Sequence, residues 1–339
     1  MRVRLLTSIG VLAGFCAWAG EALSVIAIDP FYAPSYTFTD LGSAPGLPFP
    51  YGGLTFKAGD TSKILIGGNA NTAAGLLYEV SVVRDAGGHI TGFSGLASAF
   101  GTVGAFNDGG VVYGPGGVLF TSQWPVNMLG QTKPGSTAAD KVIDLGALGV
   151  ASSHSALNFV PTGFSGAGNM KLVYWSGGQW YDGVLTPDGF GTFDLGITPV
   201  DLDLVASGIQ NLPGGPEGFV YISGANPIFT ANSLLVSEFS ANKVASYEID
   251  SSGNPILSTR RTFVDGLTGA EGAVIDPVTG DFLFSTFGDA VDRIIVVQGF
   301  TVLPPPPPPI PEPETYALML AGLGLLGFAA RRRKQKDAA

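Results

Sequence analysis

Three acidic residues occupy corresponding positions in a short sequence motif that recurs along the chain. Asp108, Glu217 and Glu271 are each followed directly by glycine and then by a short apolar run. Carboxylate and amide oxygens are the ligands that Ca²⁺ prefers, so these acids predict a calcium site, with Asn158 as a fourth ligand and Asn107 and His154 at neighbouring positions. The alternative is that each acid caps a turn or hydrogen-bonds a neighbouring strand. The predicted cofactor is therefore either none or Ca²⁺.

The sequence offers few residues for other kinds of catalysis. The sequence has two histidines, His89 and His154, and one cysteine, Cys16, which leaves a transition metal almost without ligands. A nucleophile elbow requires Gly-x-Ser-x-Gly, and the segment 163–167 ends in alanine instead of glycine. These patterns predict that the protein is not an enzyme of the Ser-His-Asp type and, more broadly, that it is non-catalytic.

Aromatic residues and charge indicate the kind of partner. Trp175 and Trp180, with Trp124 and Tyr181 nearby, are predicted to stack on a glycan; the alternative is that they fill space in the core. The formal net charge is −10, and residues 20–310 alone hold 10 Lys and Arg against 24 Asp and Glu. Nucleic acid is therefore excluded as a partner.

These residues have to be positioned by strands. The chain has 50 glycines and 45% hydrophobic residues, with Val, Ile and Phe in short runs between turn residues, which predicts an all-β fold. A glycine-rich start followed by two apolar strands recurs from positions 53, 110, 156, 218 and 272. Tyr78-Glu79-Val80 and Tyr247-Glu248-Ile249, each before an Asp-containing turn, support the same period.

A repeat of this length with hairpin turns predicts a β-propeller of four-stranded blades. We count five blades in the domain 20–303, and the irregular stretch 182–212 leaves room for a sixth. The last repeat is one strand short, so a strand near residues 35–41 is predicted to complete it and close the ring. A pair of β-sandwich domains is the alternative.

The short motifs that contain the three acids resemble those of a known family. Asn107-Asp108-Gly109-Gly110, Pro216-Glu217-Gly218 and Ala270-Glu271-Gly272 loosely resemble motifs of NHL-type and gluconolactonase-like propellers. The resemblance implies a divalent cation held by Glu and Asn in the central channel. It also makes a lactonase-like, metal-dependent hydrolase the alternative to a non-catalytic protein.

The N-terminus predicts export. Arg2 and Arg4 precede an apolar stretch that ends in Ala17-Trp18-Ala19, the pattern of a secretory signal peptide over residues 1–19. Signal peptidase is the expected partner, and Cys16 would leave with the peptide.

The C-terminus combines a spacer, an apolar segment and a basic end. A proline-rich linker (304–310), which is extended and stiff, precedes a sorting segment (311–336). Within it, the apolar run 315–330 is predicted to be a transmembrane helix, and the Arg cluster would stay cytoplasmic. The residues predicted to be read in sorting are Pro311, Glu312, Pro313, Arg331, Arg332 and Arg333.

This C-terminal order resembles the PEP-CTERM sorting signal of Gram-negative exopolysaccharide producers. The resemblance implies that exosortase processes the chain near Pro311-Glu312-Pro313 after a transient stay in the inner membrane. An ordinary membrane anchor is the alternative. The resulting prediction is a non-catalytic protein of the cell surface or the extracellular matrix, with exopolysaccharide as a candidate partner and a polysaccharide-binding module as a further alternative.

The interpretation of the C-terminal segment as a sorting signal gives a direct prediction. Replacing Pro311-Glu312-Pro313 with alanines should leave full-length protein in the inner membrane, because the processing enzyme loses the residues it reads. The parent should appear outside the cell or on its surface without residues 315–339. Mass spectrometry of the exported protein measures this, and a surface form that retains Arg331 to Lys336 would show that the tail is only an anchor.

Overall fold

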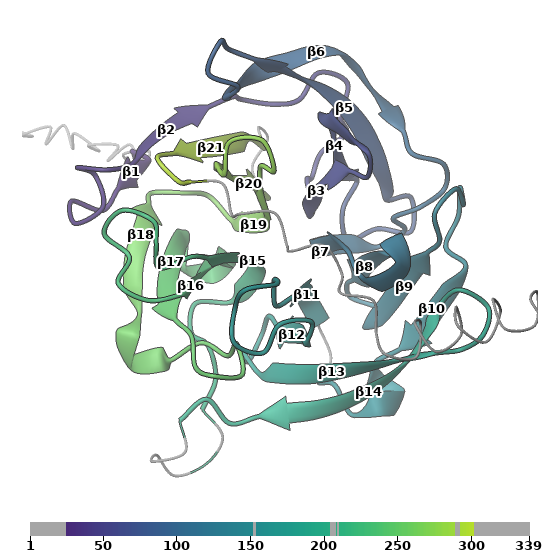
Figure 1. Cartoon of the computed structure of the whole chain (residues 1–339). Coiled ribbons are helices and arrows are strands. Elements are labelled where there is room, and N and C mark those ends of the chain that lie inside the picture. Colours follow the sequence, from purple (N-terminus) through teal and green to yellow (C-terminus); the bar gives the residue numbers. More distant parts are fainter. Residues whose placement is uncertain (1–24, 152–153, 204–207, 209, 289–291, 302–339) are drawn as a thin grey trace, which may run out of the picture.

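A computed structural model describes residues 25–151, 154–203, 208, 210–288 and 292–301. It confirms the predicted class, because five β-sheets form the blades of a propeller around a central axis (Figure 1). The predicted signal peptide, proline-rich linker and sorting segment lie outside the described residues. Within the described part of the chain, no helix is long and apolar enough to cross a bilayer.

The first three blades each contain four antiparallel strands, numbered outward from the axis. Blade 1 consists of β3 (Leu54–Lys57), β4 (Asp60–Gly68), β5 (Leu76–Arg84) and β6 (Ile90–Ala99). Blade 2 consists of β7 (Asn107–Tyr113), β8 (Leu119–Gln123), β9 (Met128–Thr132) and β10 (Lys141–Asp144). Blade 3 consists of β11 (His154–Phe159), β12 (Met170–Tyr174), β13 (Trp180–Pro187) and β14 (Phe193–Val200).

Each of the last two blades also includes a strand from the N-terminal part of the chain. Blade 4 consists of β15 (Pro216–Ile222), β16 (Ser233–Glu238), β17 (Lys243–Glu248) and β18 (Arg261–Asp265), with β1 (Ala27–Ile28) added at its rim. Blade 5 consists of β19 (Ala270–Ile275), β20 (Phe282–Thr286), β21 (Ile294–Gln298) and β2 (Thr37–Asp40). Short 3₁₀ turns lie at Pro115–Gly117, Gly146–Leu148, Phe239–Ala241 and Leu257–Thr259.

The stretch 182–212 does not add a blade. Its residues 182–187 and 193–200 belong to β13 and β14, the two outer strands of blade 3, which pair over eight residues. The described residues therefore contain five blades and no sixth. The predicted strand near residues 35–41 is confirmed, because β2 pairs with β21 in register Thr37 to Gln298.

The core lies between the blades, because each sheet buries both of its faces. Five apolar clusters fill the five junctions between neighbouring blades. Alternation along β16 shows how one strand serves two of them: Leu234 and Val236 face blade 3, whereas Leu235 faces blade 5. Period-2 alternation of this kind is what a strand imposes on its side chains. Continuous apolar runs in the sequence are therefore strands with two buried faces.

The innermost strands meet at glycines. A β-carbon on Gly272 would lie 2.5 Å from the α-carbon of Gly53, and one on Gly53 would lie 2.6 Å from the carbonyl oxygen of Gly109. A β-carbon on Gly109 would lie 3.0 Å from the backbone nitrogen of Gly218, which belongs to a blade across the axis. Backbones this close leave no room for side chains, so the channel is closed at this level.

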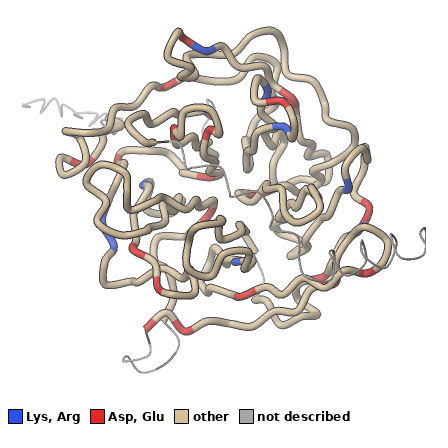
Figure 2. The backbone as a smooth tube through the Cα atoms, in the orientation of Figure 1, with Lys and Arg blue, Asp and Glu red and all other residues tan. Residues whose placement is uncertain are grey.

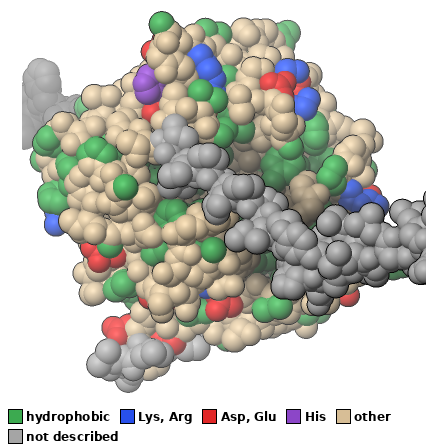
Figure 3. All heavy atoms as spheres, viewed as in Figure 1, with side chains coloured by type: hydrophobic (Ala, Val, Ile, Leu, Met, Phe, Trp, Pro, Cys, Tyr) green, Lys and Arg blue, Asp and Glu red, His purple; other side chains and the backbone are tan. Residues whose placement is uncertain are grey.

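Charged groups are sparse on the surface. On the face shown in Figure 3, Lys, Arg, Asp and Glu form small separate groups, in keeping with a content of 13% charged residues. Figure 2 shows acidic positions beside the axis as well as on the rim. The acids at the axis are the exceptional ones, because charged groups in a propeller interior require a partner.

Ring closure is reinforced between the first and the last blade. Arg84 donates to Asp276 across this junction, with 3.0 Å between Nη2 and Oδ1, and His89 Nδ1 lies 2.7 Å from Asp281 Oδ2. Hydrogen bonding to Asp281 raises the pKa of His89. The turn at His89 thus contacts blade 5.

Replacing Gly272 with alanine tests the contact at the axis. The new methyl group meets backbone atoms of blade 1, so the free energy of unfolding should fall by about 1–3 kcal/mol. Gly92→Ala is the matched control, because a β-carbon there meets nothing within 4 Å, and it should change stability by less than about 0.5 kcal/mol. Urea unfolding measures both, and equal stability of the two variants would contradict close packing at the axis.

Candidate metal centre

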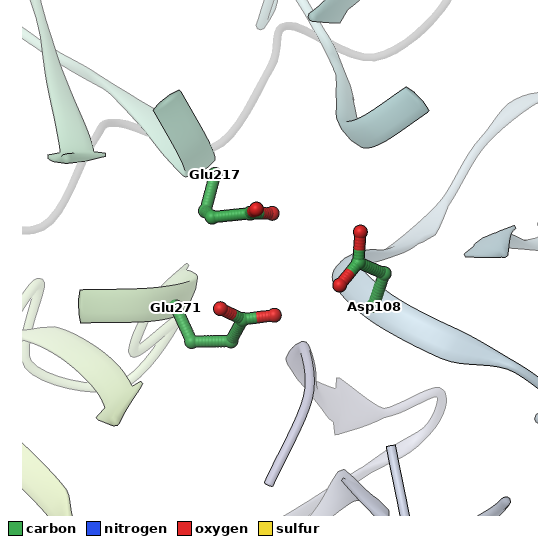
Figure 4. Close-up of side chains that lie close together, drawn as sticks. All are labelled: Asp108, Glu217 and Glu271. Carbon is green, nitrogen blue, oxygen red and sulfur yellow. The ribbon is translucent and has the colours of Figure 1, made fainter. Parts of the chain in front are cut away.

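Three carboxylates converge on the axis at one end of the channel. One oxygen from each of Asp108, Glu217 and Glu271 can be chosen so that all three lie within 4.8 Å of one another. Figure 4 shows the side chains approaching one another from different blades. The exposed fractions are 2%, 4% and 1% in the same order, so these are buried acids.

A β-bulge places each acid. Register shifts interrupt the pairing of the innermost strand with the second strand between Asn107 and Val111, between Pro216 and Phe219, and between Ala270 and Ala273. A bulge re-aims a side chain that would otherwise alternate with its neighbours. The acid-glycine pair therefore has two roles, since the acid projects to the mouth and the glycine closes the axis.

In two of the three blades, a serine on the second strand hydrogen-bonds the backbone of the bulge. Ser122 Oγ accepts a hydrogen bond from the backbone nitrogen of Gly110 at 2.8 Å. Ser285 Oγ accepts from the backbone nitrogen of Gly272 at 2.9 Å and donates to the carbonyl of Gly52 at 2.6 Å. Hydrogen bonds from the neighbouring strand thus fix the backbone that carries Asp108 and Glu271.

Each acid keeps one oxygen without a hydrogen bond. Asp108 Oδ2, Glu217 Oε2 and Glu271 Oε1 are buried and have no partner among the described residues. Asp108 and Glu271 hydrogen-bond to each other, and the amide nitrogen of Asn71, oriented to donate, lies 3.0 Å from Asp108 Oδ1. Unpartnered buried carboxylate oxygens are costly, and a cation would satisfy all three together.

Burial and mutual repulsion hold protons on this cluster. Desolvation raises the pKa of Asp108 to about 7. Desolvation, followed by repulsion from Asp108 and Glu271, raises the pKa of Glu217 well above its usual value. The pKa of Glu271 is also well raised, by desolvation and then by Asp108.

The other predicted ligands lie elsewhere. Asn158 donates to the carbonyl of Phe219 at 2.7 Å and lines an apolar cavity formed farther along the innermost strands. His154 is fully buried, hydrogen-bonds its own strand at Ala156, and has its pKa lowered to about 4 by desolvation. The structure thus brings together the three predicted acids and does not bring Asn158 to them.

Aromatic side chains surround the acids. A cavity of about 180 Å³ is lined by the three carboxylates and by Asn71, Trp124, Trp175, Phe239 and Phe287. Of the two predicted stacking residues, Trp175 lines this cavity. Trp180 does not, because it is fully buried against Phe219 and donates to Asn254.

Sequence reasoning missed Asn71, Phe239 and Phe287. The two phenylalanines had a usable signal, because each directly follows a second strand that ends in small or polar residues. Aligning the repeats on their second strands instead of their first would have revealed them. Asn71 lies in a loop outside the repeat and had no such signal.

Comparison of the sequence with protein families gives one match, at the C-terminal end. Residues 309–334 match the PEP-CTERM protein-sorting motif. The chain carries a PEP-CTERM sorting signal. The motif implies an exported protein that is sorted by exosortase through a membrane-anchored intermediate. The sequence finds no match among curated proteins.

Solved structures with a similar shape are propellers. The pyranose dehydrogenase PQQ domain from Coprinopsis cinerea has 9% identity and a TM-score of 0.44, over 84% of this chain and 99% of that one. A candidate 6-phosphogluconolactonase from Bacteroides uniformis has 15% identity and a TM-score of 0.40, over 78% and 75%. The PQQ-bound aldose sugar dehydrogenase from Streptomyces coelicolor has 11% identity and a TM-score of 0.37, over 76% and 84%.

These neighbours correct one prediction. The sequence predicted a non-catalytic protein, and the structural neighbours are mostly enzymes, so that prediction is wrong. The prediction rested on the lack of a Ser-His-Asp or transition-metal pattern, and such a lack carries no information about chemistry at other residues. The likenesses transfer no reaction to this chain at such low identity.

The carboxylate cluster predicts how stability depends on pH. The folded-state pKa values are raised, so the stabilising contribution of each protonated acid is complete below the unfolded value of about 4. It is lost as pH rises through the folded-state value, which is about 7 for Asp108 and well above the usual value for Glu217 and Glu271. In EDTA, the parent should lose stability relative to a Glu217→Gln, Glu271→Gln double variant over this range.

Urea unfolding at several pH values measures the difference. Calcium at pH 8 should restore stability to the parent and leave the double variant unchanged. Parallel pH curves for the two proteins, with no effect of calcium, would show that the acids act only as turn caps.

Proposed function

We propose that this exported propeller is a divalent-cation-dependent hydrolase that opens a lactone ring at the acidic mouth of its channel. The observation that carries the proposal is the convergence of three buried carboxylates, each with an unpartnered oxygen. Calcium is the cation that these hard oxygen ligands suit best. Asp108, Glu217 and Glu271 would hold it, and solvent and substrate would complete its coordination.

The reaction is a hydrolysis that conserves oxidation state. Water adds to the ester carbonyl carbon, the ring carbon–oxygen bond breaks, and the released alkoxide takes a proton to give a hydroxy acid. A cation at the carboxylates would supply Lewis acidity at the carbonyl oxygen. The chain's own groups fix the cation, keep the site partly dry and orient the ring; bulges and glycines make this arrangement rigid.

Other reaction classes fit the residues less well. A quinone cofactor of the PQQ type carries several carboxylates, and no Lys, Arg or His is found among the described residues that line the cavity. A Ser-His pair is also disfavoured, because His154 is enclosed in its own strand. Hydrolysis assisted by a hard cation uses the groups that are present.

The sorting signal sets the compartment of this activity. The motif implies export. We propose in addition that signal peptidase removes residues 1–19, that exosortase releases the tail after transient residence in the inner membrane, and that the enzyme works at the cell surface or outside the cell, among exopolysaccharide.

Hydrolysis of D-glucono-1,5-lactone, followed as acid release at constant pH, tests the activity. The parent should hydrolyse the lactone with calcium, lose activity in EDTA and recover it on readdition. Glu217→Gln should reduce kcat/KM at least about 100-fold, comparable to loss of a group that stabilises developing charge. Glu248→Gln, a matched change on the peripheral strand β17, should match the parent. Equal rates in Glu217→Gln and the parent would exclude the proposal.

A further inference from the structure

Four aromatic residues occupy one equivalent position in four blades. Each is the first residue after the second strand of its blade: Trp124 after β8, Trp175 after β12, Phe239 after β16 and Phe287 after β20. Blade 1 has Asn69 at this position, after β4. We call the four residues the aromatic collar. All four line the cavity above the carboxylates.

Three of the four collar residues form a connected wall. Trp175 contacts Phe239 with ring centroids 6.3 Å apart, and Phe239 contacts Phe287 at 5.8 Å. The planes of these successive pairs meet at 79° and 67°, an edge-to-face arrangement that aromatic pairs favour. All four side chains are only partly buried.

Glycines two residues before the acids make room for the collar. A β-carbon on Gly215 would lie 2.9 Å from Trp175 Nε1, and one on Gly269 would lie 2.8 Å from Phe239 Cε2. Gly215 precedes Glu217, and Gly269 precedes Glu271, in the next blade. The segment that presents an acid therefore also seats the aromatic ring of the blade before it.

The polar groups of this cavity are few. The carboxylates lie at its base, Asn71 lies beside Asp108, and the indole Nε1 of Trp124 is buried without an acceptor. The described lining has no cationic side chain. A volume of about 180 Å³ is below the usual range of about 300–1,000 Å³ for ligand pockets, which favours a single ring over a polymer chain.

We propose that the aromatic collar is a binding platform for one uncharged sugar ring, and that it makes the site select neutral rings over anionic ones. The aromatic faces would pack against the C–H face of the ring, and Trp124 would donate its N–H to a ring oxygen or hydroxyl. In the absence of a bound cation, an anionic ring would meet the three acids without any compensating positive charge, because the described lining has no cationic side chain. As the substrate class of the lactone hydrolysis this rests on the proposed function, whereas ring binding stands independently.

Two probes that differ in one group test the proposal. Methyl β-D-glucopyranoside is uncharged, and methyl β-D-glucuronide carries a carboxylate in place of the hydroxymethyl group. Calorimetry and tryptophan fluorescence, on the exported protein in EDTA, should show the glucopyranoside binding at least tenfold more tightly than the glucuronide.

Collar variants separate stacking from hydrogen bonding. Trp175→Ala should weaken glucopyranoside binding at least tenfold. Trp124→Phe keeps a ring and removes the N–H, and it should weaken binding severalfold. Phe190→Ala is the control, because this aromatic is 82% exposed between β13 and β14 on the outer edge of blade 3, and it should bind like the parent. Circular dichroism verifies that each variant is folded.

The outcomes separate this proposal from the proposed function. No binding of either probe, equal affinity for both, or unchanged affinity in Trp175→Ala would overturn the collar proposal, even if the lactone is hydrolysed. Binding that depends on the collar, without any lactone hydrolysis, would support the collar and overturn the hydrolase. Loss of hydrolysis in Glu217→Gln with normal hydrolysis in Trp175→Ala would leave the cation site and remove the collar from substrate recognition.

Discussion

The approach of the innermost strands to one another is the contact on which the rest of this structure depends. Gly53, Gly109, Gly218 and Gly272 bring backbones from four blades to distances that exclude any β-carbon. Because the axis is closed there, the carboxylates just before three of these glycines cannot be hydrated through the channel from the other end. The depth, dryness and one-sided opening of the site thus follow from the absence of four side chains.

The same geometry creates an electrostatic conflict that the fold has to withstand. Three acids with almost no exposed surface repel one another, and burial opposes their ionisation. Fixed bulges and the hydrogen bonds of Ser122 and Ser285 prevent the strands from relaxing outward. Apolar packing between all five blades supplies the stability that tolerates this strain. Groups held in so unfavourable a state are typical of functional sites.

The fold and part of the site could be predicted from the sequence. Repeated acid-glycine phrases and strand-length apolar runs were sufficient to predict five blades, the closing strand β2 and the meeting of Asp108, Glu217 and Glu271. Asn158 was misplaced because it is the fifth residue of β11, whereas each acid is the second residue of its strand, and the bulges that direct the acids were not visible in the pattern. Trp180 was misread because its burial depends on Phe219, a residue distant in sequence. The non-catalytic prediction rested on the lack of a Ser-His-Asp or transition-metal pattern, and such a lack carries no information about chemistry at other residues.

Closure of the ring by β2 and β21 determines the order in which this chain can finish folding. The last blade needs Thr37–Asp40 from one end and Ile294–Gln298 from the other, so translocation must deliver nearly the whole domain before the ring can lock. Only ten residues separate Gln298 from the start of the sorting motif at residue 309. Because the closing strand and the sorting motif are neighbours in the sequence, the ring can close only shortly before the motif itself follows.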